Sequence, residues 1–225
     1  MPMPSYYPLF LDLNQAKCLV VGAGRVGRRK MGSLLESGVR ELVVLDPELP
    51  DSALLPEHPA LAFEARCFTP EDLAGCTLVF AASGSRETNA AVAAACAERG
   101  ILCNCADAPL EGNCIVPATA RAGEMTLALS TGGASPAYAR FLREELEGWL
   151  HEKAPLATLL GRIRPRQLAL EMDTMHNTAL FRTLVRSELG AALAAGDLNH
   201  CRELLTAALP EDLHPWIAEF LDGLV

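Results

Sequence analysis

The chain has 225 residues, which permits one large domain or two small ones, and half of its residues are hydrophobic, which is ample for a core. The formal net charge of −9 argues against non-specific binding to nucleic acid or to a membrane, because both require a basic face. No apolar run reaches transmembrane length, and residues 1–16 lack the apolar core of a signal peptide. We therefore expect a cytoplasmic protein with reduced thiols and no nucleic-acid or membrane partner.

Residues 1–16 form a proline-rich lead-in. Within it, the apolar run Tyr7–Leu11 is expected either to form an edge strand or to pack over the end of a sheet.

The next stretch has the pattern strand, glycine turn, helix, strand and acid. The apolar run Cys18–Val21 is followed by Gly22–Gly27, which is a complete G-x-G-x-x-G. A helical pattern then runs to Gly38, and a second apolar run, Leu42–Leu45, ends at Asp46. This context is typical of a dinucleotide-binding unit, whereas the alternative is a doubly wound sheet that uses its glycines only for packing.

Each part of the glycine turn has a physical role in that interpretation. Gly22 permits the tight turn, Gly24 lets the backbone approach a pyrophosphate, and Gly27 lets the helix pack against its strand. The helix N-terminus offers free N–H groups and partial positive charge to the phosphates. Asp46 follows Gly27 by 19 residues, where an acid binds a ribose diol and repels a 2′-phosphate, so the predicted cofactor is NAD rather than NADP.

Strands and helices continue to alternate up to about residue 105. After a proline-rich loop at 47–60, the patterns predict a strand at 61–65, a helix start at 69–72 with Thr69 as N-cap, a strand at 77–82, a helix at 86–99 capped by Gly100, and a strand at 101–105. This alternation predicts a parallel sheet covered on both faces. Cys103 and Cys105 are two residues apart on a strand, so both are expected to be buried on one face.

Four predicted strand ends carry polar or glycine-rich turns, and the carboxyl ends of parallel strands meet at one edge. These turns are Gly22–Gly27, Asp46-Pro47, Ser83–Ser85 and Asn104–Asp107. The residues predicted to contact the cofactor are Gly22, Gly24, Arg25, Val26, Gly27, Asp46, Pro47, Ser83 and Asn104.

The pattern changes after residue 112. Two strands are expected at 113–118 and 125–130, with a turn at 121–124, and then a helix from Pro136 to about His151 with Ser135 as N-cap. From Pro155 onwards the chain is helical in pattern, with Asp197 and Pro210 as boundaries. The predicted fold class is α/β, with an N-terminal Rossmann-type doubly wound parallel sheet, a small α+β segment and a C-terminal helical domain.

Four stretches of the chain resemble the precorrin-2 dehydrogenase family, the dehydrogenase/ferrochelatase module of siroheme synthase. They are residues 7–11; residues 18–30, where the family reads C-L-V-V-G-G-G-x-V-A-x-R-K; residues 104–109, where it reads N-V-V-D-x-P; and residues 129–144, where it reads I-S-T-G-G-x-S-P-x-L-A-R-x-L-R-E. Order and spacing agree over about residues 5–150, and the last stretch is the most specific.

This resemblance implies an NAD-dependent oxidation of precorrin-2 to sirohydrochlorin and, in some members, insertion of ferrous iron to give siroheme. It also implies a homodimer whose segment around residues 113–150 crosses between subunits. The domains expected on this basis are an NAD-binding Rossmann domain at 1–112, a dimerisation segment at 113–152, and a helical domain at 153–225 that helps to wall the tetrapyrrole cleft.

Asp107 is the predicted catalytic residue. A dehydrogenation releases a proton, which a carboxylate near the ring can accept, and the essential acid of the family falls on this position. The alternative is that Asp107 only opens an Asp-Ala-Pro turn, where Asp is common.

A second candidate site, for the substrate, comprises Thr131, Gly132, Gly133 and Ser135. Backbone N–H groups before the helix at Pro136 can bind a substrate carboxylate, or the residues can serve only as a helix cap.

Arg140 and Arg143 suit bidentate contacts with carboxylates of the substrate, although pairing with Glu144 and Glu147 on a solvated helix face is the simpler alternative. The five histidines show no ligand spacing, so no metal site is predicted.

Two other functions are compatible with parts of the sequence. A nucleotide-sensing module needs the glycine turn and Asp46 but neither Asp107 nor residues 129–144, and it binds NAD without consuming it. A chelatase that keeps the dinucleotide domain as a scaffold needs Asp107 but no bound NAD.

Overall fold

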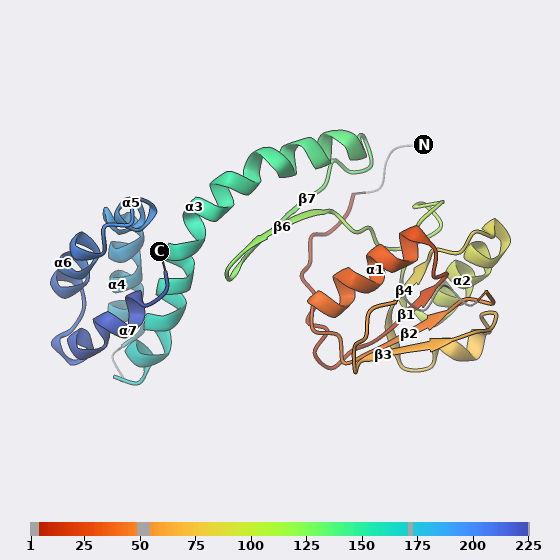
Figure 1. The fold of residues 1–225 in the computed structure, drawn as a ribbon, viewed down its shortest axis with the longest axis horizontal. Helices are drawn as coiled ribbons and strands as arrows, with labels where there is room; N and C mark the ends of the chain where they lie inside the picture. The colour runs from red at the N-terminus through yellow and green to blue at the C-terminus, as the bar shows by residue number, and fades with distance from the viewer. Residues whose placement is uncertain (1–4, 49–54, 171–172, 225) are drawn as a thin grey trace. The chain divides into compact units, whose positions relative to one another are not determined.

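The computed structural model describes residues 5–48, 55–170 and 173–224. The chain divides into two compact units, with the boundary between Val116 and Pro117 (Figure 1). The domain limits expected at residues 112 and 152 stay predictions.

The first unit is a five-stranded parallel sheet in the order β3-β2-β1-β4-β5. Its elements are β1 (Lys17–Val21), α1 (Arg25–Glu36), β2 (Glu41–Leu45), β3 (Leu61–Glu64), the 3-10 helix η2 (Pro70–Leu73), β4 (Cys76–Ala81), α2 (Arg86–Arg99) and β5 (Leu102–Cys105). The strands and helices predicted between residues 17 and 105 are confirmed, apart from the segment after Thr69. The segment after Thr69 is a single 3-10 turn, and part of the predicted loop at 47–60 lies outside the described residues.

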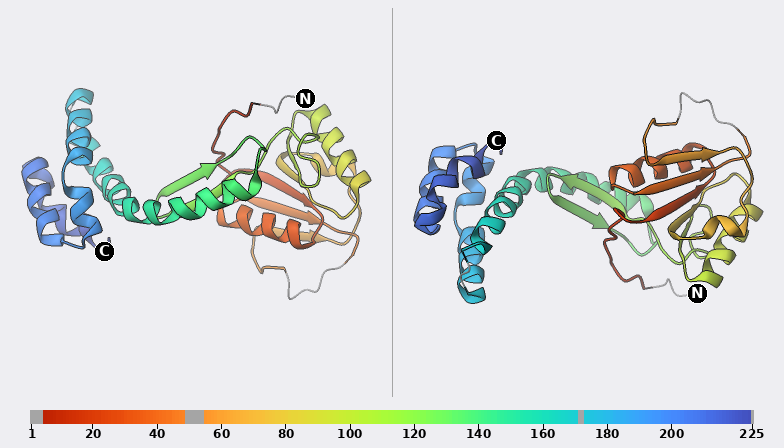
Figure 2. Two further views of the ribbon diagram at one scale, coloured as in Figure 1. Left: turned by 90° about the horizontal axis from the view of Figure 1, so that it is seen from above. Right: turned by 90° about the horizontal axis from the view of Figure 1, so that it is seen from below.

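The sheet is covered by α1 on one face and by α2 on the other (Figure 2). Met31 and Leu34 of α1 pack with Val20 and Val44 of the central strands. On the opposite face, α2 packs against a cluster that is rich in small side chains. That cluster includes Leu19, Val79, Ala81, Val92, Ala93, Cys96, Cys103 and Cys105. The expectation that Cys103 and Cys105 share a buried face is confirmed, since each is 1% exposed.

The apolar run Tyr7–Leu11 was expected to form an edge strand or to pack over the end of the sheet, and this expectation is wrong. Tyr7 and Phe10 are 87% and 69% exposed, and residues 5–13 form no strand. The core contact comes later, because Leu13 and Ala16 are buried beside β1 in the α1-side core.

The prediction of a strand at 113–118 is also wrong, because residues 113–117 form no strand. Asn113 uses its side chain to bond the edge of β5, because its Oδ1 accepts from the Cys103 N–H at 2.7 Å and its Nδ2 donates to the Ile101 carbonyl at 2.8 Å. The amide side chain thus makes the bonds that a paired strand would make, and Pro117 has no N–H to donate. The strand begins only at Ala118.

The second unit contains a β-hairpin and a group of helices. Its elements are β6 (Ala118–Ala122), β7 (Met125–Leu129), α3 (Pro136–Leu168), α4 (Thr174–Arg186), α5 (Leu189–Ala194), α6 (Leu198–Ala208), the 3-10 helix η3 (Glu211–Trp216) and α7 (Ile217–Leu221). The antiparallel hairpin packs against the first half of α3 through Ala120, Ala122, Leu150 and Ala154. The second half of α3 packs against the later helices. Asp197, which was predicted as a boundary, is the N-cap of α6.

Helix α3 has 33 residues and does not end near His151 as expected. Pro155 and Pro165 lie inside it, although an interior proline removes a hydrogen bond and costs about 3 kcal/mol. Buried side chains on both sides of Pro155 offset this cost, because Leu150 packs on the hairpin and Leu159 on the helical core. Among the described helices, none is long and apolar enough to cross a membrane.

Gly112 is required by a close approach of backbone to backbone. A Cβ atom there would lie 2.5 Å from the Cys103 carbonyl oxygen and 3.0 Å from the Cys105 nitrogen. We predict that Gly112→Ala lowers the free energy of unfolding by about 2–3 kcal/mol in chemical denaturation. Gly32→Ala on α1 is the matched control, because a Cβ there meets no atom within 4 Å and should raise stability by about 0.5–1 kcal/mol. Equal effects of the two changes would contradict the prediction.

Candidate functional site

The site lies at the carboxyl edge of the parallel sheet, where the order reverses between β1 and β4. Backbone hydrogen bonds continue past the strand ends. Gly22 N–H donates to the Leu45 carbonyl at 2.7 Å, Ala82 N–H to Val21 at 2.8 Å, and Ala106 N–H to Ala81 at 2.9 Å. The loops that follow β1, β2, β4 and β5 therefore leave the sheet from one edge, as predicted. We call this edge the rim.

The glycine turn packs backbone on backbone at the rim. Gly22 has φ +105°, and a Cβ there would lie 2.5 Å from the Ala82 carbonyl oxygen of the loop after β4. A Cβ at Gly27 would overlap the Gly22 carbonyl oxygen, so α1 lies directly against the turn. Gly24 differs from both, because a Cβ there would meet no atom within 4 Å. The open space of the turn is therefore at Gly24.

The N-terminus of α1 faces this turn without a side-chain cap. Gly24 is the N-cap residue, no side chain accepts a hydrogen bond there, and no acidic residue lies in the first turn. Arg25 is exposed and Val26 half-buried in that turn. Uncapped N–H groups and the helix dipole favour an anion, so the residues present fit the pyrophosphate of a dinucleotide.

Asp46 lies beside the glycine turn. Its Oδ2 accepts from the Ala23 N–H at 2.7 Å, and its Oδ1 accepts from the Glu48 N–H at 3.0 Å across the exposed Pro47. Each carboxylate oxygen keeps further acceptor capacity, which a ribose diol can use. Asp46, which is predicted to bind the ribose, thus lies next to the turn that is predicted to bind the pyrophosphate.

Ser83, after β4, is held by a buried amide that was not predicted from the sequence. Asn89 of α2 is 1% exposed, its Oδ1 accepts from the Ser83 N–H at 3.0 Å and from the Ser83 hydroxyl at 2.9 Å, and its Nδ2 donates to the Ser83 carbonyl at 3.1 Å. The helical spacing of Asn89 to Val92 and Cys96 was the available signal, since it places a polar residue on the buried face of α2.

Asn104 lies on β5 but faces away from the α2 side of the sheet. Its side chain is buried, and its Nδ2 donates to the Cys114 carbonyl at 3.1 Å. This hydrogen bond of Asn104 joins the segment after Asn113 to β5. Its predicted contact with the cofactor remains a prediction.

Asp107 is on the rim, in the turn after β5. Its Oδ1 accepts from the Cys105 thiol at 3.2 Å, and its Oδ2 lies 3.9 Å from a guanidinium nitrogen of Arg86. Burial acts to raise the pKa of Asp107, but hydrogen bonds from Cys105 and Asn89 and the Arg86 charge outweigh it, so the pKa is lower than usual. The residue is therefore a carboxylate at neutral pH.

Arg86 is a second rim residue that was not predicted from the sequence. It is the first residue of α2, where the helix dipole disfavours a cation, and it forms a two-bond ion pair with Glu111, one bond at 2.8 Å. The side chain is 58% exposed. Its partners lie 21 and 25 residues away in sequence, so no local pattern signals the cluster.

The predicted substrate residues lie in the second unit, at the start of α3. The Ser135 hydroxyl accepts from the Tyr138 N–H at 3.2 Å, and the Thr131 hydroxyl both accepts from the Ser135 N–H and donates to the Ser135 carbonyl at 3.1 Å. Gly132 and Gly133 have φ +63° and +89°. The helix cap is therefore present, and a role in substrate binding remains a prediction.

Arg140 forms an i,i+4 ion pair with Glu144 at 3.0 Å on the exposed face of α3, and Arg143 pairs with both Glu144 and Glu147. This is the arrangement expected for a solvated helix face. It leaves the predicted contact of Arg140 with substrate untested.

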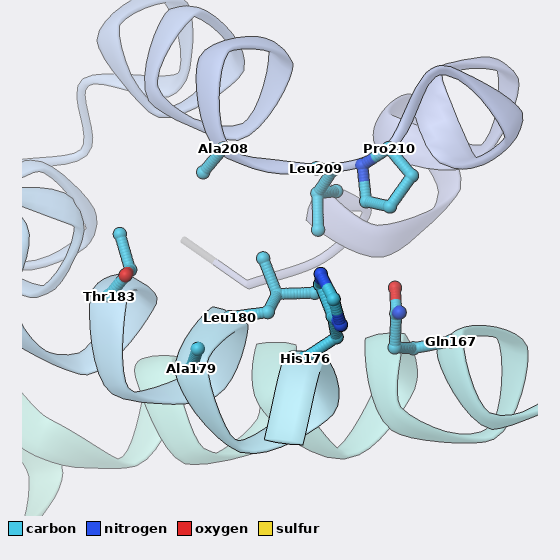
Figure 3. Close-up of a pocket in the computed structure, with 8 residues that line it drawn as sticks. All are labelled: Gln167, His176, Ala179, Leu180, Thr183, Ala208, Leu209 and Pro210. Atoms are coloured by element: carbon cyan, nitrogen blue, oxygen red, sulfur yellow. The ribbon is translucent and has the colours of Figure 1, made fainter. Parts of the chain in front are cut away.

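The helical part of the second unit has a hollow of about 380 Å³ between α3, α4 and the segment after α6 (Figure 3). It is lined by Gln167, His176, Ala179, Leu180, Thr183, Ala208, Leu209 and Pro210, and it includes no predicted site residue. Within the described residues, no group of three or more His, Cys, Asp or Glu side chains is arranged to hold a metal ion.

Two family models match the chain. The model described as "Putative NAD(P)-binding" matches residues 9–118, and the model described as "Sirohaem biosynthesis protein central" matches residues 123–148. The first covers the glycine turn and the rim, and the second covers β7 and the start of α3.

Curated relatives match over nearly the whole chain. The chain is 36% identical to Siroheme synthase 1 of Aeromonas salmonicida (strain A449) over 213 residues, which is 92% of this chain and 45% of that protein. It is 32% identical to the siroheme synthase of Citrobacter koseri over 92% of this chain and 46% of that protein. The chain thus spans about half the length of these relatives.

The solved structure of "SirC, precorrin-2 dehydrogenase" has the same fold. The TM-score is 0.72 at 23% identity, over 90% of this chain and 98% of that one. With its NAD(P)-binding domain and sirohaem synthase central domain, the chain belongs to the precorrin-2 dehydrogenase family, which includes the corresponding module of the siroheme synthases.

Proposed function

We propose that the chain catalyses the NAD-dependent dehydrogenation of precorrin-2 to sirohydrochlorin. One observation carries this proposal: an ionised carboxylate, Asp107, lies on the same rim as the glycine turn and Asp46. A sensor that binds NAD without turnover has no use for this carboxylate. The family membership supports the same reaction.

The reaction divides into a hydride transfer and a proton transfer. The bound nicotinamide supplies the hydride acceptor. Asp107 accepts the proton that the substrate loses from the second C–H bond, whose electron pair stays on the substrate as the new double bond, and then releases the proton to water. In total, one substrate and one oxidised cofactor give one product, one reduced cofactor and one proton.

The lowered pKa of Asp107 sets the pH dependence. Hydrogen bonds and Arg86 stabilise the carboxylate, so the residue is a base throughout the neutral range. Turnover should be lost only as the pH falls through this lowered pKa, because protonation removes the base.

The first test is Asp107→Asn, which keeps the shape and removes the base. We predict a loss of about 10²–10⁴-fold in kcat, measured as NADH formation from precorrin-2 and NAD under anaerobic conditions. NAD affinity, measured by calorimetry, should stay near that of the wild type. Normal turnover by the folded variant would exclude Asp107 as the base.

We further propose that the cofactor is NAD rather than NADP. The Asp46 carboxylate, fixed by the Ala23 and Glu48 N–H groups, would repel a 2′-phosphate in the ribose position. The charge, rather than the shape of the turn, then sets the preference.

Asp46→Asn separates charge from shape, because the amide oxygen can still accept from Ala23. We predict that the ratio of the Kd values for NADP and NAD falls by about tenfold, in titrations of both cofactors. Glu48→Gln is the matched control, since Glu48 is an exposed carboxylate two residues away, and it should leave the ratio unchanged. An unchanged ratio in Asp46→Asn would count against the Asp46 charge as the source of the preference for NAD.

We also propose that two copies of the chain form a homodimer through the hairpin and the first half of α3. Both strands of a two-stranded hairpin have an unpaired edge, and such a hairpin is only marginally stable alone. On α3, Tyr138 and Phe141 stack with ring centroids 6.3 Å apart, and both are about half exposed, as is Trp149. Exposed aromatic side chains at helical spacing are typical of an interface.

Trp149→Glu should weaken association by at least about tenfold, seen as a shift towards monomer in sedimentation velocity. Val185→Glu is the control, because Val185 lies on α4, outside the proposed interface, and is about as exposed as Trp149, at 55% against 49%. A wild-type monomer, or an equal effect of both changes, would contradict the proposed interface.

A further inference from the structure

Cys105, the last residue of β5, places a thiol against the carboxylate of Asp107. Its Sγ donates to Asp107 Oδ1 at 3.2 Å, and the residue is 1% exposed. Burial and the neighbouring carboxylate raise the pKa of Cys105 to about 11. The side chain therefore stays an S–H group at neutral pH and can donate throughout that range.

This contact makes the two oxygens of Asp107 unequal. Oδ1 is engaged by the Cys105 thiol, whereas Oδ2 lies 3.9 Å from Arg86. The side chain of Asp107 is 36% exposed, and that of Arg86 is 58% exposed. Oδ1 is thus bonded to the buried end of β5, and Oδ2 is on the side of the exposed guanidinium.

We propose that Cys105 is a positioning residue for Asp107, whose S–H···Oδ1 bond fixes the carboxylate so that Oδ2 takes the proton from the substrate. This inference rests on the proposed dehydrogenation. It adds a buried thiol that keeps its proton at neutral pH, has no access to substrate and acts only through Asp107. A general base works best when its reacting oxygen is held in one orientation, because misplacement lowers the rate.

The groups that face Asp107 come from three parts of the described first unit. Cys105 approaches from β5, Arg86 and Asn89 approach from α2, and Glu111 of the following loop acts through its ion pair with Arg86. The charges of Arg86 and Glu111 and the neutral amide of Asn89 stay the same when only Cys105 is changed. Loss of the thiol bond therefore destabilises only the ionised form of Asp107, and its pKa must rise.

The test compares two substitutions at Cys105. Cys105→Val fills the buried site without a donor, and Cys105→Ser keeps a donor of similar size. For Cys105→Val we expect the acidic limb of kcat to move to higher pH and kcat on the plateau to fall by roughly two- to tenfold, with the Kd for NAD unchanged. Cys105→Ser should restore both properties towards the wild type.

Cys103→Val is the matched control. Cys103 is equally buried on the same face of β5, but its free thiol forms a hydrogen bond with the thiol of Cys96 and not with Asp107. It should leave the pH profile unchanged. If the role of Cys105 is purely structural, both valine variants should lose stability, and the acidic limb of kcat should stay at the wild-type pH in both.

A second measurement does not depend on turnover. The ¹³C resonance of the Asp107 carboxyl group, assigned with Asp107→Asn, should titrate at higher pH in Cys105→Val than in the wild type and in Cys105→Ser. Equal titration in all three proteins would overturn the positioning role, whatever the activity. An inactive wild type with the expected titration shift would instead overturn the proposed dehydrogenation and leave the thiol–carboxylate coupling standing.

Discussion

The close approach of two loop backbones at the reversal point of the sheet is the constraint on which the rest of the site depends. The backbone at Gly22 lies so near Ala82 that a side chain there would meet the carbonyl oxygen at 2.5 Å. This contact joins the turn after β1 to the loop after β4, and Asn89 fixes the latter loop through Ser83. Because the next loop carries Asp107, a cofactor on the glycine turn and the proposed base lie on one rigid edge.

Local charge at this edge differs from that of the whole chain. The chain carries a net charge of −9, yet the first turns of α1 hold Arg25, Arg28 and Arg29 beside an uncapped helix N-terminus. An anionic cofactor therefore meets positive potential where it binds. Arg86, compensated by Glu111, likewise places a cation beside Asp107 and helps to keep that carboxylate ionised. The proposed substrate, which carries carboxylates, would approach the same cation.

Sequence periodicity predicted the first unit well because its signals are local. The apolar runs of β1 and β4 are buried on both faces, Ser85 caps the start of α2, and Gly100 ends it in the left-handed conformation. Local rules failed where a distant partner decided the structure. Asn113 bonded the edge of β5 instead of starting a strand, and packing on both sides carried α3 through Pro155.

The same distinction holds for the site. Gly22, Gly27 and Asp46 were found from one motif, because their spacing alone encodes the geometry. The surroundings of Asp107 were not found, since Arg86 and Asn89 reach it from α2 and have no motif of their own. Cys105 was predicted to be buried, but its bond to Asp107 depends on how the turn after β5 folds back.

The most direct test of the proposed dehydrogenation is the stoichiometry of the reaction in the purified, full chain. Precorrin-2 and NAD are mixed with the protein without oxygen, and NADH and sirohydrochlorin are followed together by their absorbance. We predict that both form at the same rate and in equal amounts. A folded protein that binds NAD and forms neither product would contradict this prediction, and the rim would then be a nucleotide-binding site without the proposed chemistry.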